Sequence, residues 1–126
     1  MENLYIEKSE RSPDVNFKID GNLFLGGESY PEDTHKFYTD IFNWLEEFVE
    51  SRPDTITFTF QLIYFNSSSS KMIYEIFDLL EDANSSVGNL KILWKFNIDD
   101  DTMEEYGEEF QEDFPNLDIQ LESFDS

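Results

Sequence analysis

Four consecutive serines, Ser67 to Ser70, follow Asn66 in the stretch YFNSSSSK and are the residues most suited to chemistry. They stand between a run of alternating apolar residues and a run with helical periodicity. A serine at a helix start can cap the free backbone N–H groups of the first turn. Those N–H groups and the helix dipole would also stabilise a phosphoryl group on the same hydroxyl. The serines are therefore loop filler, helix caps or a site of reversible phosphorylation.

Enzymatic chemistry has little support in the rest of the chain. His35 is the single histidine and falls in the first turn of a predicted helix, where the dipole disfavours a positive charge. The sequence contains no G-x-S-x-G, Walker or G-x-G-x-x-G motif, and it has no cysteine. We expect a protein that is not an enzyme, with no catalytic residue and no cofactor, and with His35 at the surface.

The acidic run that begins at Asp99 suggests a metal site, but its spacing is wrong for one. A calcium-binding EF-hand loop needs glycine at its sixth position, and a loop that starts at Asp99 would have Glu104 there. Acidic residues are also favoured at a helix N-terminus by the dipole. We expect a solvent-exposed acidic helix and no metal.

Hydrophobic periodicity predicts strands that alternate with helices. Asp20 and Gly21 suit a tight hairpin turn between the second and third strands, and Gly26-Gly27 would end the third. Asp33 or Thr34 can cap the first helix, and Thr102 with Glu105 would form a capping box for the third. The predicted strands are 3–8, 15–19, 22–27, 55–65, 90–96 and 117–121, and the predicted helices are 33–50, 71–83 and 102–114.

The segment 55–65 shows the clearest strand pattern. Ile56, Phe58, Phe60, Leu62 and Tyr64 alternate with polar residues, so we place all five on the buried face. The threonines opposite them indicate that one face of the sheet is less fully covered. The element order predicts an α/β fold in one domain over residues 1–126, with a mixed sheet of 4–6 strands and about three helices.

The charge of the chain limits its partners. Asp and Glu number 29 against 8 Lys and Arg, for a net charge of −21. Such a surface repels nucleic acid and anionic membranes, and favours basic proteins or divalent cations, or serves solubility alone. The N-terminus has no signal-peptide pattern and no apolar run reaches the roughly 20 residues that span a bilayer. We therefore expect a cytoplasmic protein without membrane insertion.

Two segments resemble a known family. Ser29-Tyr30-Pro31-Glu32, followed by a helix with Trp44-Leu45, is similar to its SYPE-containing segment. Asn66-Ser67-Ser68-Ser69, Lys71 and the run IFDLLE at 76–81 resemble its second signature in order and spacing. The family is that of the SiaC-type biofilm regulation phosphoproteins, which are similar to STAS-domain anti-sigma-factor antagonists. The resemblance spans roughly 17–114.

This resemblance implies a STAS-like fold and a bacterial partner-switching regulator. The unmodified protein would bind and activate a diguanylate cyclase. A cognate kinase would phosphorylate the hydroxyl directly after Asn66 and so block that contact, and a PP2C-type phosphatase would reverse the modification. By position the acceptor is Ser67, while the serine run leaves Ser68 and Ser69 as alternatives. The implied partner-binding residues are Ser29, Tyr30, Pro31, Glu32, Asn66, Ser68 and Lys71, with Lys71 a candidate charge partner for the phosphate.

A second hypothesis comes from the charge alone. The protein would act as an acidic decoy that occupies a basic protein surface independently of phosphorylation. It predicts strongly salt-dependent binding through 99–113, with no effect of changes at Ser67.

Overall fold

The computed structural model describes residues 1–125, which form six strands, three α-helices and one short 3-10 helix. Strands and helices alternate after an all-strand start, as the sequence predicts. The elements are β1 (Leu4–Ile6), β2 (Asp14–Phe17), β3 (Asn22–Ser29), α1 (Thr34–Glu50), β4 (Thr55–Phe65), α2 (Ser67–Ala83), η1 (Asn84–Ser86), β5 (Asn89–Asn97), α3 (Asp101–Asp113) and β6 (Asp118–Phe124).

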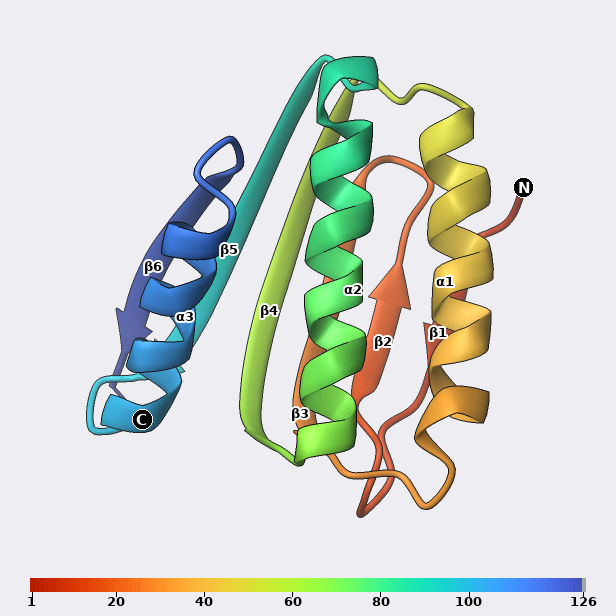
Figure 1. The fold of residues 1–126 in the computed structure, drawn as a ribbon. Coiled ribbons are helices and arrows are strands. Elements are labelled where there is room, and N and C mark those ends of the chain that lie inside the picture. Colours follow the sequence, from red (N-terminus) through yellow and green to blue (C-terminus); the bar gives the residue numbers. More distant parts are fainter. Residues whose placement is uncertain (126) are drawn as a thin grey trace.

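The strands of this part of the chain form one mixed sheet in the order β1-β2-β3-β4-β5-β6. β1, β2 and β3 pair antiparallel, whereas β3 to β6 pair parallel. Parallel neighbours joined by helices use right-handed crossovers, and successive crossovers in one direction place every helix on the same face. Figure 1 shows this arrangement, with α1, α2 and α3 all in front of the sheet. The predicted fold class is confirmed.

The other face of the sheet has no helix over it. Thr57, Thr59 and Gln61 of β4 point to that face and remain half-buried, while Ile56 and Phe58 on the helix side are buried. This agrees with the expectation drawn from the threonine-rich pattern. No helix within residues 1–125 combines the length and the apolar character needed to cross a membrane.

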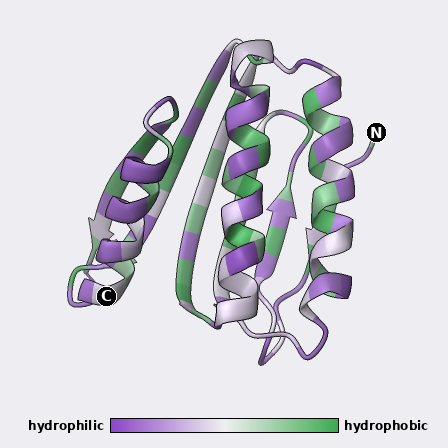
Figure 2. Cartoon of the chain, in the orientation of Figure 1, coloured by the Kyte–Doolittle hydropathy of each residue, from purple (hydrophilic) through white to green (hydrophobic). Residues whose placement is uncertain are grey.

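Aromatic side chains join the helices to the sheet. Phe60 of β4 stacks on Phe77 of α2 with ring centroids 5.0 Å apart, and Phe77 stacks on Phe110 of α3 at 4.2 Å. The indole N–H of Trp94 in β5 donates to the Met103 carbonyl at 2.9 Å. Hydrophilic residues predominate along the visible side of α3 and alternate with hydrophobic ones along α1 and α2 (Figure 2). These contacts fix α2 relative to the sheet.

The helix starts differ in part from the prediction. Asp33 caps α1, as expected, by accepting from the Lys36 amide. α3 is capped by Asp100, which accepts from the Met103 amide at 3.0 Å, so the predicted Thr102 and Glu105 capping box is wrong. The aspartate carboxylate reaches the third amide of the helix directly, so the helix starts one residue before Thr102.

Strands β3 and β4 end differently from the prediction. β3 does not end at Gly26-Gly27, because its parallel pairing with β4 continues to Ser29. Gly27 pairs with Leu62 and Glu28 pairs with Tyr64, so Ile63 is an extra residue in β4 at this register shift. An extra residue in one strand reverses the side-chain alternation beyond it. Tyr64 is therefore 52% exposed, and its predicted place on the buried face is wrong.

Candidate functional site at the start of helix α2

The candidate site lies where β3 and β4 end. Parallel strands bring their carboxyl ends to the same edge of a sheet, which is where α/β proteins commonly bind their ligands. The Asn66 amide donates to the Ser29 carbonyl at 3.1 Å, directly after the last paired residues of the two strands. The segments 29–32 and 66–71, far apart in sequence, are thus neighbours in the fold.

Asn66 determines where α2 begins. Its backbone is extended, with φ −83° and ψ 177°, and its side-chain oxygen accepts from the Ser69 amide at 2.9 Å. Its carbonyl accepts from the Ser70 amide at 2.9 Å, which starts the helical hydrogen bonds. The serines are therefore the first turn of α2 and not a loop before it, and the cap is the asparagine. The prediction placed the start of this helix four residues too late.

The first two serines of α2 face solvent. Ser67 is the first helical residue, Ser68 is the second, and both are exposed. Lys71 is also exposed and follows Ser67 by four residues, a spacing that places two side chains on the same face of a helix. A phosphate on Ser67 would therefore lie at the helix N-terminus and on the same face of α2 as Lys71.

Ser69 belongs to a buried chain of hydroxyl groups. The Ser29 hydroxyl donates to Ser69 Oγ at 2.8 Å, and Ser29 Oγ lies 2.7 Å from Tyr38 Oη. Since Ser29 gives its one proton to Ser69, Tyr38 must donate to Ser29. All three side chains are 0% exposed. Burial raises the pKa of Tyr38 to about 12, so its hydroxyl stays protonated and remains a donor near neutral pH.

This burial separates the predicted site residues into two groups. Ser69, an alternative acceptor, is closed off from solvent, and so is Ser29, which was placed on the partner surface. The hydrogen bond between these two buried side chains instead holds the end of β3 against the start of α2. Tyr30 and Pro31 are half-buried and Glu32 is exposed, so these three remain available to a partner.

An aromatic pair beside the serines was missed by the sequence analysis. The rings of Tyr30 and Tyr64 meet edge-to-face with centroids 5.8 Å apart. The Tyr30 amide also donates to the Arg11 carbonyl at 2.7 Å, which brings the β1–β2 connection to the same edge. Partial desolvation and the nearby Glu28 raise the pKa of Tyr30. The alternation of β4 gave no signal for this pair, because only the bulge turns Tyr64 outward.

Two other sets of candidate residues lie elsewhere. His35 is exposed in the first turn of α1, and the glutamates of α3 are spread along its solvent side. Over residues 1–125, no three acidic or histidine side chains converge in a way that would hold a metal ion.

Comparison with known proteins shows close relatives of this fold. Residues 6–124 match the family described as SiaC family regulatory phosphoprotein. An uncharacterized protein of Pseudomonas aeruginosa (strain UCBPP-PA14) is 29% identical over 114 residues, which cover 90% of each chain. The structure of apo-SiaC from Pseudomonas aeruginosa is similar with a TM-score of 0.85 and 27% identity, over 97% of this chain and 99% of that one.

A second solved structure contains a partner. It is the complex of the diguanylate cyclase SiaD with its activator SiaC from Pseudomonas aeruginosa, with a TM-score of 0.89 and 26% identity over 96% of this chain and 99% of the other. These matches agree with the motifs at Ser29 and Asn66 and extend over almost the full sequence. The chain belongs to the SiaC family of regulatory phosphoproteins.

Proposed function

We propose that this protein is a partner-switching regulator whose unmodified form binds and activates a diguanylate cyclase, and that phosphorylation of Ser67 blocks this contact. A kinase and a PP2C-type phosphatase would set the fraction of protein that carries the phosphate. Family membership supports the regulatory role, and the cyclase complex of a structural relative supports the class of effector. The observation that carries the assignment to Ser67 is its exposed hydroxyl at the first position of α2.

The accessibility of the serines favours Ser67 over the alternatives. Ser69 would have to leave its buried hydrogen bond with Ser29 before a kinase could reach it. Ser68 is exposed like Ser67, but it is not the residue directly after the capping Asn66. Ser68 is therefore the alternative that an experiment has to separate from Ser67.

A phosphate at Ser67 would act mainly on a bound partner. It adds a charge of about −1.5 to −2, and a helix N-terminus stabilises such a charge by about 0.3–1 kcal/mol. The fold is therefore not expected to lose stability. A partner that covers this surface would have to desolvate the phosphate, which is costly when no opposite charge is supplied. Tyr30 and Tyr64 would supply the apolar part of the covered surface, beside the acceptor.

The first experiment is phosphopeptide mass spectrometry on the protein from its native cells, with phosphatases inhibited during lysis. The peptide that spans 61–71 contains all four serines. Phosphate on Ser67 is the expected result. Phosphate found only on another residue, or on none under several growth conditions, would contradict the assignment.

The second experiment measures binding and activation of a diguanylate cyclase from the same organism. Ser67→Ala is expected to bind like the unmodified protein, and Ser67→Glu to bind at least about tenfold more weakly, because it places an unpaired charge at the contact. Ser68→Glu is the matched control, since it adds the same charge one residue further along α2. Equal affinities for the Ser67 variants, or an equal loss for both glutamates, would remove Ser67 as the specific switch.

A further inference from the structure

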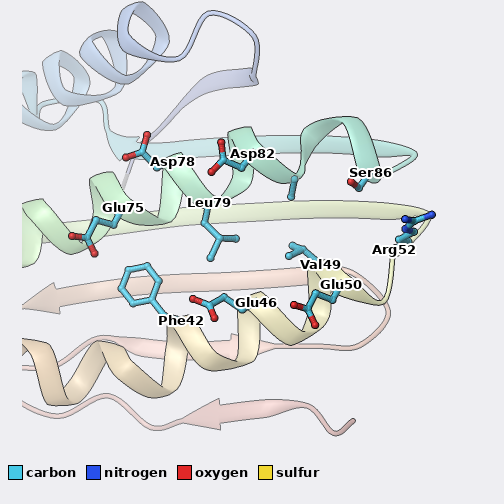
Figure 3. A pocket seen from close by; sticks show the side chains of 11 residues that line it. Phe42, Glu46, Val49, Glu50, Arg52, Glu75, Asp78, Leu79, Asp82 and Ser86 are labelled. Atoms are coloured by element: carbon cyan, nitrogen blue, oxygen red, sulfur yellow. The ribbon is translucent and has the colours of Figure 1, made fainter.

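A groove separate from the serines runs between α1 and α2. Its volume is about 690 Å³. Phe42 and Val49 from α1 and Leu79 from α2 form its apolar floor, and all three are partly buried. Figure 3 shows these three side chains in the space between the two helices, with Arg52 at one end. We refer to this feature as the α1–α2 groove.

Carboxylates line both sides of the α1–α2 groove. Glu46 and Glu50 project from α1, and Glu75, Asp78 and Asp82 from α2 (Figure 3). Their spacing of three and four residues keeps each set on one side of its helix. All five are exposed, and within residues 1–125 none of them forms an ion pair with Lys, Arg or His. An apolar floor with unpaired negative walls is chemically complementary to a positively charged amphipathic segment.

We propose that the α1–α2 groove docks a basic amphipathic helix of a partner protein. A helix-in-groove contact places apolar residues at i, i+3 or i+4 and i+7 on the floor, where they would cover Phe42, Val49 and Leu79. Lysine or arginine on the flanks of that helix would reach the carboxylates of both walls. From Glu75 to Ala83 the groove follows α2 for about 12 Å, which is a little over two helical turns, and it continues past the end of α2 to Ser86 of η1.

The charge of the chain selects this occupant over others. A second copy would bring 29 Asp and Glu with only 8 Lys and Arg, so acidic surfaces would face each other. Nucleic acid and anionic lipid would be repelled for the same reason.

This docking goes beyond the proposed switch and does not depend on it. Glu75, the groove carboxylate nearest to Ser67 along α2, lies eight residues after it, or about 12 Å, and Asp78 lies about 16 Å away. Exposed charges at these separations are largely screened at physiological salt, where the Debye length is about 8 Å. A charge at Ser67 is therefore not expected to change affinity at the groove.

The test uses a fluorescent synthetic peptide of about 14 residues, long enough to span the groove as a helix. It has leucine at i, i+4, i+7 and i+11 and lysine or arginine at most other positions. A scrambled peptide of identical composition has the same charge but no apolar face. Binding to the full-length protein is measured by fluorescence anisotropy at several salt concentrations. The patterned peptide is expected to bind at least about tenfold more tightly than the scrambled one.

Two triple variants localise the contact. The groove variant combines Glu46→Gln, Asp78→Asn and Asp82→Asn. The matched control combines Glu104→Gln, Glu105→Gln and Glu108→Gln on the exposed side of α3, with the same change in net charge. The groove variant should bind the patterned peptide about tenfold more weakly, as expected for three lost exposed charge pairs, whereas the control should change affinity by less than about threefold.

Three results would overturn the proposal: equal loss in both triple variants, equal binding of the two peptides, or a change of comparable size in Ser67→Glu, where the added negative charge would strengthen binding of a basic peptide held beside it. The first two would mean that net charge alone attracts the peptide. The third would place the peptide at the switch site. Since Ser67→Glu is also tested against the cyclase, failure of the groove and failure of the switch give different patterns. Circular dichroism spectra confirm that each variant is folded.

Discussion

The buried hydroxyl chain under the serines gives the sharpest prediction about stability. Ser29→Ala removes the side-chain oxygen that lies 2.7 Å from Tyr38 Oη and 2.8 Å from Ser69 Oγ. Alanine is close to serine in size, so the substitution creates almost no cavity. It does leave the Tyr38 hydroxyl without its acceptor in a place where Tyr38 is 0% exposed.

The magnitude follows from these contacts. Each neutral hydrogen bond contributes about 1 kcal/mol net, and a buried donor left without an acceptor costs about 1–3 kcal/mol. The Ser29→Ala variant should therefore lose about 2–4 kcal/mol of unfolding free energy. Urea denaturation followed by circular dichroism measures this loss.

A matched control removes a serine hydroxyl from an exposed pair. Ser9 Oγ lies 2.6 Å from Ser12 Oγ and also accepts from the Arg11 and Ser12 amides, but all of these hydrogen bonds are exposed and the groups can bond to water in its place. Ser9→Ala should change the unfolding free energy by less than about 0.5 kcal/mol.

A double-mutant cycle tests the cause of the loss. If the orphaned Tyr38 hydroxyl is responsible, adding Tyr38→Phe to Ser29→Ala should cost little more than Ser29→Ala alone, with a coupling of about 1–2 kcal/mol. Additive losses, or a Ser29→Ala variant as stable as the wild type, would refute the reasoning.

Three further predictions concern the stability of the fold. Asn66→Ala should lose about 1 kcal/mol of unfolding free energy in urea because the Ser69 amide loses its cap, whereas Asn66→Asp should keep it. Gly107→Ala should destabilise by about 1–3 kcal/mol in the same assay despite its better helix propensity, since a Cβ there would lie 2.6 Å from Trp94 Cδ1. Because the pKa of Tyr38 is raised to about 12, the folded state keeps its proton where the unfolded chain has lost it. Stability present below about pH 10 should fall by about 2–3 kcal/mol as the pH rises to about 12, as measured by denaturation at each pH, and Tyr38→Phe should reduce that fall.

Each of these has a clear opposite outcome. An Asn66→Asp variant that loses as much stability as Asn66→Ala would show that the cap bond is not the cause. A Gly107→Ala variant more stable than the wild type would mean that α3 can move away from β5. An unchanged pH profile in Tyr38→Phe would assign the alkaline loss to other tyrosines.

The sequence predicted most elements because their patterns depend on local spacing. The alternation of β4 and the three-to-four-residue periodicity of α1 are signals that burial of one face imposes directly. The family resemblance implied one partner surface for the motifs at Ser29 and Asn66, and the structure brings the two motifs side by side. Their closeness follows from parallel strands ending at one edge, and the Asn66 amide bonded to the Ser29 carbonyl shows it directly.

What the sequence could not show depends on contacts between distant residues. The bulge that exposes Tyr64 arises from pairing with Gly27 and Glu28, more than thirty residues earlier. The burial of Ser69 depends on its contact with Ser29, which in turn contacts Tyr38. A run of four serines gives no indication of which one makes such a contact. The α1–α2 groove exists only because two helices lie side by side on one face of the sheet.

The hydrogen bonds around Ser67 indicate whether a phosphate there would act through its charge or by changing the local fold. To shift the start of α2, a phosphate would have to break the Asn66 cap and the buried bond between Ser29 and Ser69, at a combined cost of about 2–4 kcal/mol. Its interaction with the helix N-terminus supplies only about 0.3–1 kcal/mol, and that interaction favours the helix start as it stands. Both the hydrogen bonds and the interaction of the phosphate with the helix N-terminus therefore oppose a shift in the start of α2. Phosphorylated protein should therefore keep the backbone of the unmodified form, and amide chemical-shift changes that extend into β3 would contradict a switch based on charge alone.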